Sequence, residues 1–146
     1  MIQNYYKIPL NFSLLTQKNK ELPRCELLQS IAQNIFMIIT SKFQEHRFDD
    51  TYGCELWDMD FELITNENLW LERIRKSIQI SIEKYEKRLD GIIVNIKILQ
   101  EEIEGRRKNS KAIKKKLEIR IEGRIMLTGE AYFSEMNIYL SPLSLD

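Results

Sequence analysis

Glu86 and Arg88 are the residues whose types and spacing best suit specific recognition, because they stand two positions apart at the end of an amphipathic segment. In an extended backbone their side chains would point the same way, whereas in a helix they would diverge by about 200°. A carboxylate beside an Arg fork forms a directional docking feature. The alternative is an ordinary ion pair at a helix end, worth about 0–1 kcal/mol.

The stretch from Glu45 to Glu62 is rich in carboxylates and offers the best case for an enzyme. Its acids are Glu45, Asp49, Asp50, Glu55, Asp58, Asp60 and Glu62. Two carboxylates held about 5–9 Å apart in a cleft can hydrolyse a glycosidic bond. Because a chain with 30% charged residues offers many such pairs, a solvated acidic face is favoured. A peptidoglycan-cleaving hydrolase is the rival interpretation.

The segment from Arg106 to Lys116 carries a run of positive charge. Its cations are Arg106, Arg107, Lys108, Lys111, Lys114, Lys115 and Lys116. Such a run can contact phosphates or an acidic protein surface, but it lacks the interleaved aromatic residues on which bases stack. Acids in 101–104 would lie beside residues 114–116 across a hairpin. A solvated hairpin tip is therefore favoured, with a protein contact and a nucleic-acid adaptor as the alternatives.

The remaining residues offer no metal or cofactor chemistry. Cys25 and Cys54 form no CxxC pair and His46 is the single histidine, so a zinc site and a catalytic triad are both disfavoured. The two thiols are expected to be free and semi-buried in a reducing compartment. The glycines form no phosphate-binding loop. We therefore predict no catalytic residue, no metal and no cofactor.

Charge and hydropathy indicate the setting of the protein. Lys plus Arg and Asp plus Glu number 22 each, so the formal net charge is zero, whereas a free nucleic-acid binder usually carries a basic excess. The N-terminal segment has no basic region followed by a long apolar run. The longest apolar stretch, Ile35–Ile39, is too short to cross a membrane. We expect a cytoplasmic protein.

Two helices and several strands must position these residues. Apolar residues at helical spacing predict helices over 24–43 and 67–86, the second capped by Asn66. Alternating residues predict strands at Ile92–Leu99 and Leu117–Leu127, joined by a hairpin whose tip is 104–115. A last strand is expected within 132–140. A short strand is expected over 56–64, with a helical turn as the alternative, and Gly53 before it suits a positive φ.

The architecture that follows is α+β, with two main helices on one face of a small, mostly antiparallel sheet that carries a long C-terminal hairpin. Residues 23–146 would form this single domain. Residues 1–22 form an apolar arm, which packs either on its own domain or on a partner. The edges of so small a sheet must be blunted or paired with another chain.

The order of these elements resembles the phage baseplate wedge, "lysozyme-like" family, which includes the TssE subunit of type VI secretion baseplates. Four stretches carry the resemblance: SIAQNIFMIITSKFQEHRFDDTYGCELWDMDFE, IEKYEKRL, GIIVNIKIL and IRIEGRIMLTGEAYFSEMNIYLSPL. The opening YYKIPLNF is similar to the start of TssE-type proteins from Bacteroidetes-like bacteria. The family has a Glu-Pro-Arg signature after its second helix, where this chain has Glu86, Lys87 and Arg88. Tyr52-Gly53 matches a Tyr/Phe-Gly of the family.

The resemblance implies a structural role and no enzyme activity. Family members bind other baseplate wedge proteins, which in secretion systems are TssF/TssG-like, and they template the first ring of a TssB/TssC-like contractile sheath. The complex assembles on the inner face of the inner membrane, without membrane insertion or nucleic acid. Joined to the expectation of exposed sheet edges, this predicts β-strand addition as the docking mode. The predicted contact residues are Glu86, Arg88, Ile92, Val94, Ile96, Arg120 and Arg124.

Overall fold

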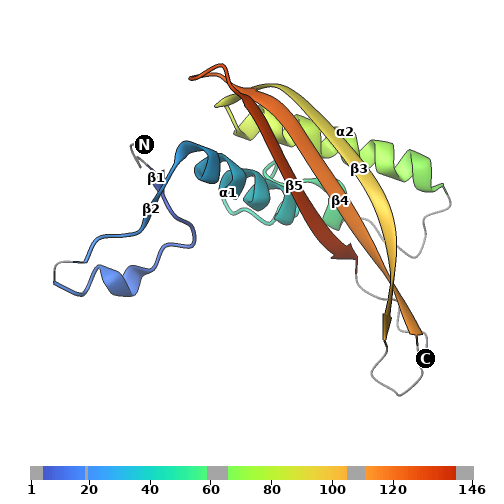
Figure 1. Cartoon of the computed structure of the whole chain (residues 1–146), viewed down its shortest axis with the longest axis horizontal. Helices are drawn as coiled ribbons and strands as arrows, with labels where there is room; N and C mark the ends of the chain where they lie inside the picture. The colour runs from blue at the N-terminus through green and yellow to red at the C-terminus, as the bar shows by residue number, and fades with distance from the viewer. Residues whose placement is uncertain (1–4, 19, 59–65, 105–110, 141–146) are drawn as a thin grey trace.

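The computed structural model describes residues 5–18, 20–58, 66–104 and 111–140 of the chain. The elements are β1 (Tyr5–Tyr6), η1 (Phe12–Leu14), β2 (Arg24–Cys25), α1 (Leu27–Thr40), η2 (Glu55–Trp57), α2 (Glu67–Tyr85), β3 (Leu89–Glu104), β4 (Lys111–Ile125) and β5 (Ala131–Leu140). β3, β4 and β5 form a sheet in that order, with both pairings antiparallel. The two helices lie against one face of this sheet (Figure 1). The predicted α+β architecture is confirmed.

One hydrophobic core fills the space between the helices and the sheet. Alternate residues of each strand point into it, while the residues between them face solvent. The large fully buried side chains of α1, α2 and β4 are Ile31, Ile35, Ile38, Ile39, Ile74, Ile78, Ile82, Leu117, Ile119, Ile121 and Ile125. Most of these are isoleucines, and those of β4 have the branched side chain that suits a pleated surface.

Helix α1 is shorter than the predicted 24–43. Arg24 and Cys25 are extended and pair with β1, and Glu26 at the N-cap has an extended backbone, so the helix starts only at Leu27. A helical pattern cannot reveal this pairing, because the partner strand lies about 20 residues away along the chain. The helix ends at Thr40, whose hydroxyl donates to the carbonyl of Phe36.

Helix α2 closely matches the predicted 67–86. The Asn66 side chain accepts a hydrogen bond from the backbone N–H of Leu69, which confirms the predicted cap. The buried stripe Trp70, Ile74 and Ile78 faces the core. The helix ends at Tyr85, one residue earlier than predicted.

Strands β3 and β4 form a longer ladder than predicted, running from Leu89 opposite Ile125 to Glu104 opposite Lys111. The predicted tip at 104–115 is therefore partly strand, and residues 105–110 lie outside the described part. A bulge places Gly91 and Ile92 opposite Gly123. Gly91 has a φ of 62°, which favours glycine at this position.

The segment between the helices follows the outside of the core. The predicted strand over 56–64 is wrong at its start, because Glu55–Trp57 forms the 3-10 helix η2; residues 59–65 lie outside the described residues. The indole N–H of Trp57 donates to the carbonyl of Ile39 at 2.7 Å and holds this turn on α1. Gly53 has a φ of 117°, which confirms the predicted positive value.

Candidate functional site

Glu86 and Arg88 lie in the short connection between α2 and β3, and the structure brings them together as predicted. Glu86 takes the C-cap position of α2 with a non-helical backbone, so its side chain turns toward Arg88. Arg88 Nη2 donates to Glu86 Oε2 at 2.6 Å, and Arg88 Nε donates to Glu86 Oε1 at 2.7 Å. The backbone N–H of Arg88 adds a third bond to Oε1 at 3.1 Å. The pair therefore has the two-point fork geometry that gives directional strength.

The carboxylate of Glu86 is enclosed, with only 1% of the residue exposed. Asn34 of α1 donates to its Oε2 at 2.9 Å. Burial alone would raise the pKa of Glu86, but the hydrogen bonds from Arg88 and Asn34 outweigh it and lower the pKa below its usual value. Glu86 is thus a buried, fully bonded anion, and it is not a free contact residue.

Arg88 is the accessible half of the pair, with 30% of its side chain exposed. Its Nη1 donates to Ser30 Oγ of α1 at 2.9 Å. The guanidinium also lies 5.3 Å from the ring centre of Tyr5, in the arm. On the other side, the carbonyl of Arg88 accepts a hydrogen bond from the backbone N–H of Met126 at 2.9 Å. This residue therefore joins α1, the arm and the turn after β4.

The predicted contact residues of β3 have their side chains inside the domain. Ile92 and Val94 are buried in the core, and Ile96 is half-buried against it. The period of two identified the apolar face of the strand, but that face is covered by the helices of the same chain. These three residues can reach another chain only through their backbone.

Arg120 and Arg124 lie on the uncovered face of the sheet. Arg120 binds Glu118 at 2.9 Å and Glu135 of β5 at 3.1 Å. Arg124 binds Asp90 of β3 at 2.8 Å. The pairs with Glu135 and Asp90 link neighbouring strands and the pair with Glu118 lies within β4, so both arginines already have partners within the chain.

The two outer strands of the sheet present open backbone. Within the described ranges, β3 pairs only with β4, and β5 pairs only with β4, so each has one side without a strand. Figure 1 shows the β3–β4 ribbon extending beyond the helices at its far end. A long edge of this kind is a template for pairing with another chain.

Among the described residues, the acids from Glu45 to Asp58 do not converge into a pair of free carboxylates. Lys42 binds Asp58 at 2.9 Å and Arg73 binds Glu55 at 2.7 Å. Residues 59–65, which include the last two acids of the stretch, lie outside the described residues.

Asp49 belongs to a network that holds the loop onto α2. Its carboxylate accepts hydrogen bonds from the hydroxyls of Thr51 at 2.6 Å and Tyr85 at 2.8 Å. The hydrogen bonds from Thr51 and Tyr85 lower the pKa of Asp49 to about 2. A carboxyl that stays ionised at neutral pH is not a general acid, so this cluster is a structural anchor.

The thiols and the histidine form no nucleophilic site. Both cysteines are free and buried. Burial raises the pKa of Cys54 to about 11, and its Sγ lies 3.3 Å from the carbonyl of Ile39. His46 packs against the ring of Tyr52 with the ring centres 5.3 Å apart. In the part of the chain that the structure describes, no cluster of His, Cys, Asp or Glu could hold a metal ion.

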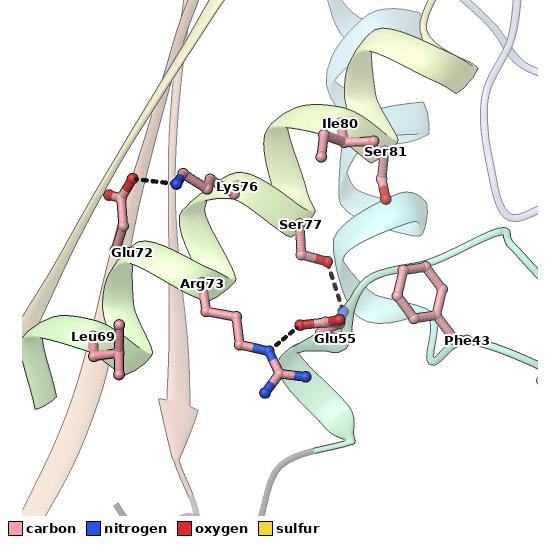
Figure 2. Close-up of a pocket in the computed structure, with 9 residues that line it drawn as sticks. All are labelled: Phe43, Glu55, Leu69, Glu72, Arg73, Lys76, Ser77, Ile80 and Ser81. Carbon is pink, nitrogen blue, oxygen red and sulfur yellow. Dashed lines mark hydrogen bonds and ion pairs between the residues drawn. The ribbon is translucent and has the colours of Figure 1, made fainter. Parts of the chain in front are cut away.

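A shallow hollow of about 500 Å³ lies on the outer side of α2, beside the segment 43–55 (Figure 2). Its lining residues are Phe43, Glu55, Leu69, Glu72, Arg73, Lys76, Ser77, Ile80 and Ser81. Figure 2 shows that each acid of the lining is bonded to a neighbouring base: Glu55 to Arg73, and Glu72 to Lys76. The hollow therefore lacks the free carboxylate pair that a glycosidase needs.

The basic run is partly paired across the hairpin, as predicted. Lys116 binds Glu101 at 2.5 Å, and Glu101 lies opposite Lys114 in the register. Arg106, Arg107 and Lys108 lie outside the described residues. In the described part of the run, Lys116 is thus paired with an acid of the neighbouring strand.

Two residues of the site were missed by sequence reasoning: Asn34 and Ser30, which bind Glu86 and Arg88 from α1. The sequence could have pointed to these two residues by their position, because both are polar and lie among the apolar residues of α1 that face the core.

No helix among the residues described is both long and apolar enough to cross a membrane.

The chain is similar in sequence and in fold to known proteins. The sequence model of the family "Baseplate wedge protein gp25" matches residues 25–130. Baseplate wedge protein gp25 of Enterobacteria phage T4 is 33% identical over 78 residues, which are 53% of this chain and 58% of that protein. The match thus spans a little over half the length of this curated relative.

Among solved structures, a crystal structure from Geobacter sulfurreducens that is named a tail lysozyme has a TM-score of 0.56. It is 21% identical to this chain and covers 83% of it and 97% of its own length. This likeness shows that the fold is shared. Since the family model covers well over half of the chain, this protein belongs to the baseplate wedge protein gp25 family.

Proposed function

We propose that this chain is a structural, non-enzymatic baseplate subunit of a contractile injection machine of the type VI secretion kind. It docks TssF/TssG-like wedge proteins and templates the first ring of a TssB/TssC-like sheath by strand addition. It carries out this role in the cytoplasm, on the inner face of the inner membrane. The observation that carries the proposal is the long outer edge of β3, which has no strand beside it among the described residues.

The contact surface combines that edge with the accessible part of the site. Ile92, Val94 and Ile96 contribute through their main-chain groups, because their side chains are enclosed. Arg88 contributes its exposed side, held in place by Glu86. Arg120 and Arg124, on the open face of the sheet, set the register against a neighbouring subunit in our proposal.

A hydrolase is a poorer fit to the same residues. Glu45, Asp49, Glu55 and Asp58 are engaged with Lys42, Arg73, Thr51 and Tyr85. Strand addition needs no free acid, whereas glycoside cleavage needs two.

Hydrogen exchange on the purified chain, alone and with TssB/TssC-like sheath proteins, tests the proposal directly. Backbone amides on a free strand edge exchange readily, and strand addition should protect alternate amides of β3 while leaving those of β4 unchanged. Protection that follows no alternation, or none along β3, would contradict the proposed docking mode.

A pair of variants separates backbone from side chain. Ile98→Pro changes a half-buried position of β3 whose N–H points away from β4, so it removes a donor from the free edge and should prevent templating of sheath polymerisation. Ile98→Ala shortens the same side chain but keeps the N–H group, so it should template normally. Equal defects in both variants, or normal templating by a folded proline variant, would reject strand addition at this edge.

A further inference from the structure

The N-terminal arm, residues 5–24, leaves its apolar side chains outside the core. Among the described residues of the arm, none joins the core cluster or packs against it, and the buried Cys25 follows the arm. Figure 1 shows the segment between β1 and β2 reaching away from the sheet and helices. The exposed apolar residues of the arm are Tyr6, Ile8, Leu10, Phe12 and Leu15. The arm therefore presents apolar surface without covering the core of its own domain.

The base of the arm is fixed to α1. The backbone N–H of Ile8 donates to Gln33 Oε1 at 2.5 Å, and the Gln33 amide lies 3.4 Å from the Sγ of Cys25. The N–H of Lys7 donates to the carbonyl of Pro23 at 2.9 Å, which closes the two ends of the arm on each other. The arm is thus a shaped loop held at its root.

Its middle is also shaped. Asn11 caps the 3-10 helix η1, and its Oδ1 accepts from both the N–H and the hydroxyl of Ser13. The hydroxyl of Thr16 donates to the carbonyl of Ser13 at 2.8 Å. A loop pre-ordered in this way loses less conformational entropy when it binds.

The exposed side chains and the charge of the arm indicate what it can bind. Tyr6, Ile8, Leu10 and Phe12 are exposed large apolar side chains on this bent, hydrogen-bonded loop, so they can enter apolar pockets of a groove. The arm also holds four cations, Lys7, Lys18, Lys20 and Arg24, against the single acid Glu21. Its three surplus positive charges contrast with the zero net charge of the whole chain, so a complementary surface is acidic.

Two other occupants fit less well. A helix that lies on a membrane gathers its apolar residues on one helical face, whereas these residues stand on a bent loop with a single 3-10 turn. A second copy of this chain offers the hollow beside α2, but its acids Glu55 and Glu72 are already bound to bases. The family model matches from residue 25, so the match does not include the arm.

We propose that residues 5–24 are a docking arm that inserts Tyr6, Ile8, Leu10 and Phe12 into an apolar groove with an acidic rim on a partner protein. The contact is separate from strand addition at β3. Its loss would leave the edge of the sheet unchanged, and the two proposals fail independently.

Photo-crosslinking from the full chain, in the cells that produce it, tests this inference. A photoreactive phenylalanine analogue replaces Phe12, and the matched control carries it at Phe48, which is more exposed at 86% against 66% but lies outside the arm. We expect an adduct from position 12 alone, and mass spectrometry of the crosslinked peptide should show apolar residues flanked by Asp or Glu.

Charge reversal decides whether the acidic rim matters. Lys7→Glu, Lys18→Glu and Lys20→Glu together should lower the yield from position 12 about tenfold. Changing the acids of the contacted peptide to lysine should restore it. An adduct to lipid or to this same chain, a contacted peptide without acids, or a yield indifferent to charge reversal would overturn the proposal.

A lipid control uses the purified full chain with vesicles of phosphatidylcholine and phosphatidylserine. We expect no sedimentation with these vesicles. Sedimentation that Phe12→Ser abolishes and Phe48→Ser leaves intact would assign the arm to a membrane surface and overturn the protein partner.

Discussion

Arg88 donates two hydrogen bonds to Glu86, with Nη2 2.6 Å from one carboxylate oxygen and Nε 2.7 Å from the other. The two residues are neighbours in sequence, yet their carboxylate and guanidinium are completed by Asn34 and Ser30 of α1. The pair therefore fastens the end of α2 to α1 at the point where the sheet begins. Any role that Arg88 has in docking depends on this attachment.

Removing the charge of Glu86 should destabilise the protein. Glu86→Gln keeps the size of the side chain but leaves Arg88 without its anion, and we expect a loss of about 2–3 kcal/mol in the free energy of unfolding. Urea unfolding at neutral pH measures it. Arg124→Ala, which breaks the exposed pair with Asp90, is the control and should change stability little. A Glu86→Gln protein as stable as the wild type would show that the pair is dispensable.

The same pair predicts a dependence on acid. The pKa of Glu86 is lowered from 4.5 in the folded state, so the native protein binds the proton less well than the unfolded chain. Stability from this group is thus fully present above pH 4.5 and is lost as the pH falls through the lowered folded value. We expect the free energy of unfolding of the wild type to fall more steeply with acid than that of Glu86→Gln. Parallel curves for the two proteins would contradict this assignment.

Cys54 should be unreactive in the native protein. Its pKa is raised to about 11 by burial, so little thiolate exists near pH 8. We expect iodoacetamide to leave Cys54 unlabelled in the folded chain and to label it after unfolding in urea, as read by peptide mass spectrometry. Rapid native labelling would mean that the segment opens locally.

Gly53 should tolerate no side chain. Its φ is 117°, and a Cβ would lie 2.5 Å from the carbonyl oxygen of Ser41. We expect Gly53→Ala to cost about 2–5 kcal/mol, from backbone strain and overpacking together. Gly129→Ala is the matched control, because Gly129 has a φ of 73° with no atom within 4 Å of a Cβ, and should cost about 1–2 kcal/mol. Thermal unfolding of both variants gives the comparison, and equal costs would refute the steric argument.

The sequence allowed the fold to be predicted where local periodicity decides the structure. The stripe of isoleucines and the Asn66 cap located α2, and strict alternation located β4 and β5. The start of α1 was misplaced because β2 forms through pairing with β1, a contact between distant residues. Composition and spacing do not record such pairings.

The site was predicted only in part for a similar reason. The proximity of Glu86 and Arg88 follows from their spacing once the helix ends, but the enclosure of Glu86 depends on Asn34, 52 residues away. The alternation of Ile92, Val94 and Ile96 identified the apolar face of β3 without indicating which residues cover that face. The helices of the same chain do so, which leaves the backbone of β3 for neighbours.

The connection between α2 and β3 has a mechanical consequence. Residue 88 bonds to α1 through Ser30, to the turn after β4 through Met126, and to the arm through Tyr5. Tension applied along the β3–β4 ribbon would be carried by the shared core and by this junction, where several bonds act in parallel. The subunit would then carry load as one rigid body, and its ribbon would not peel away from its helices.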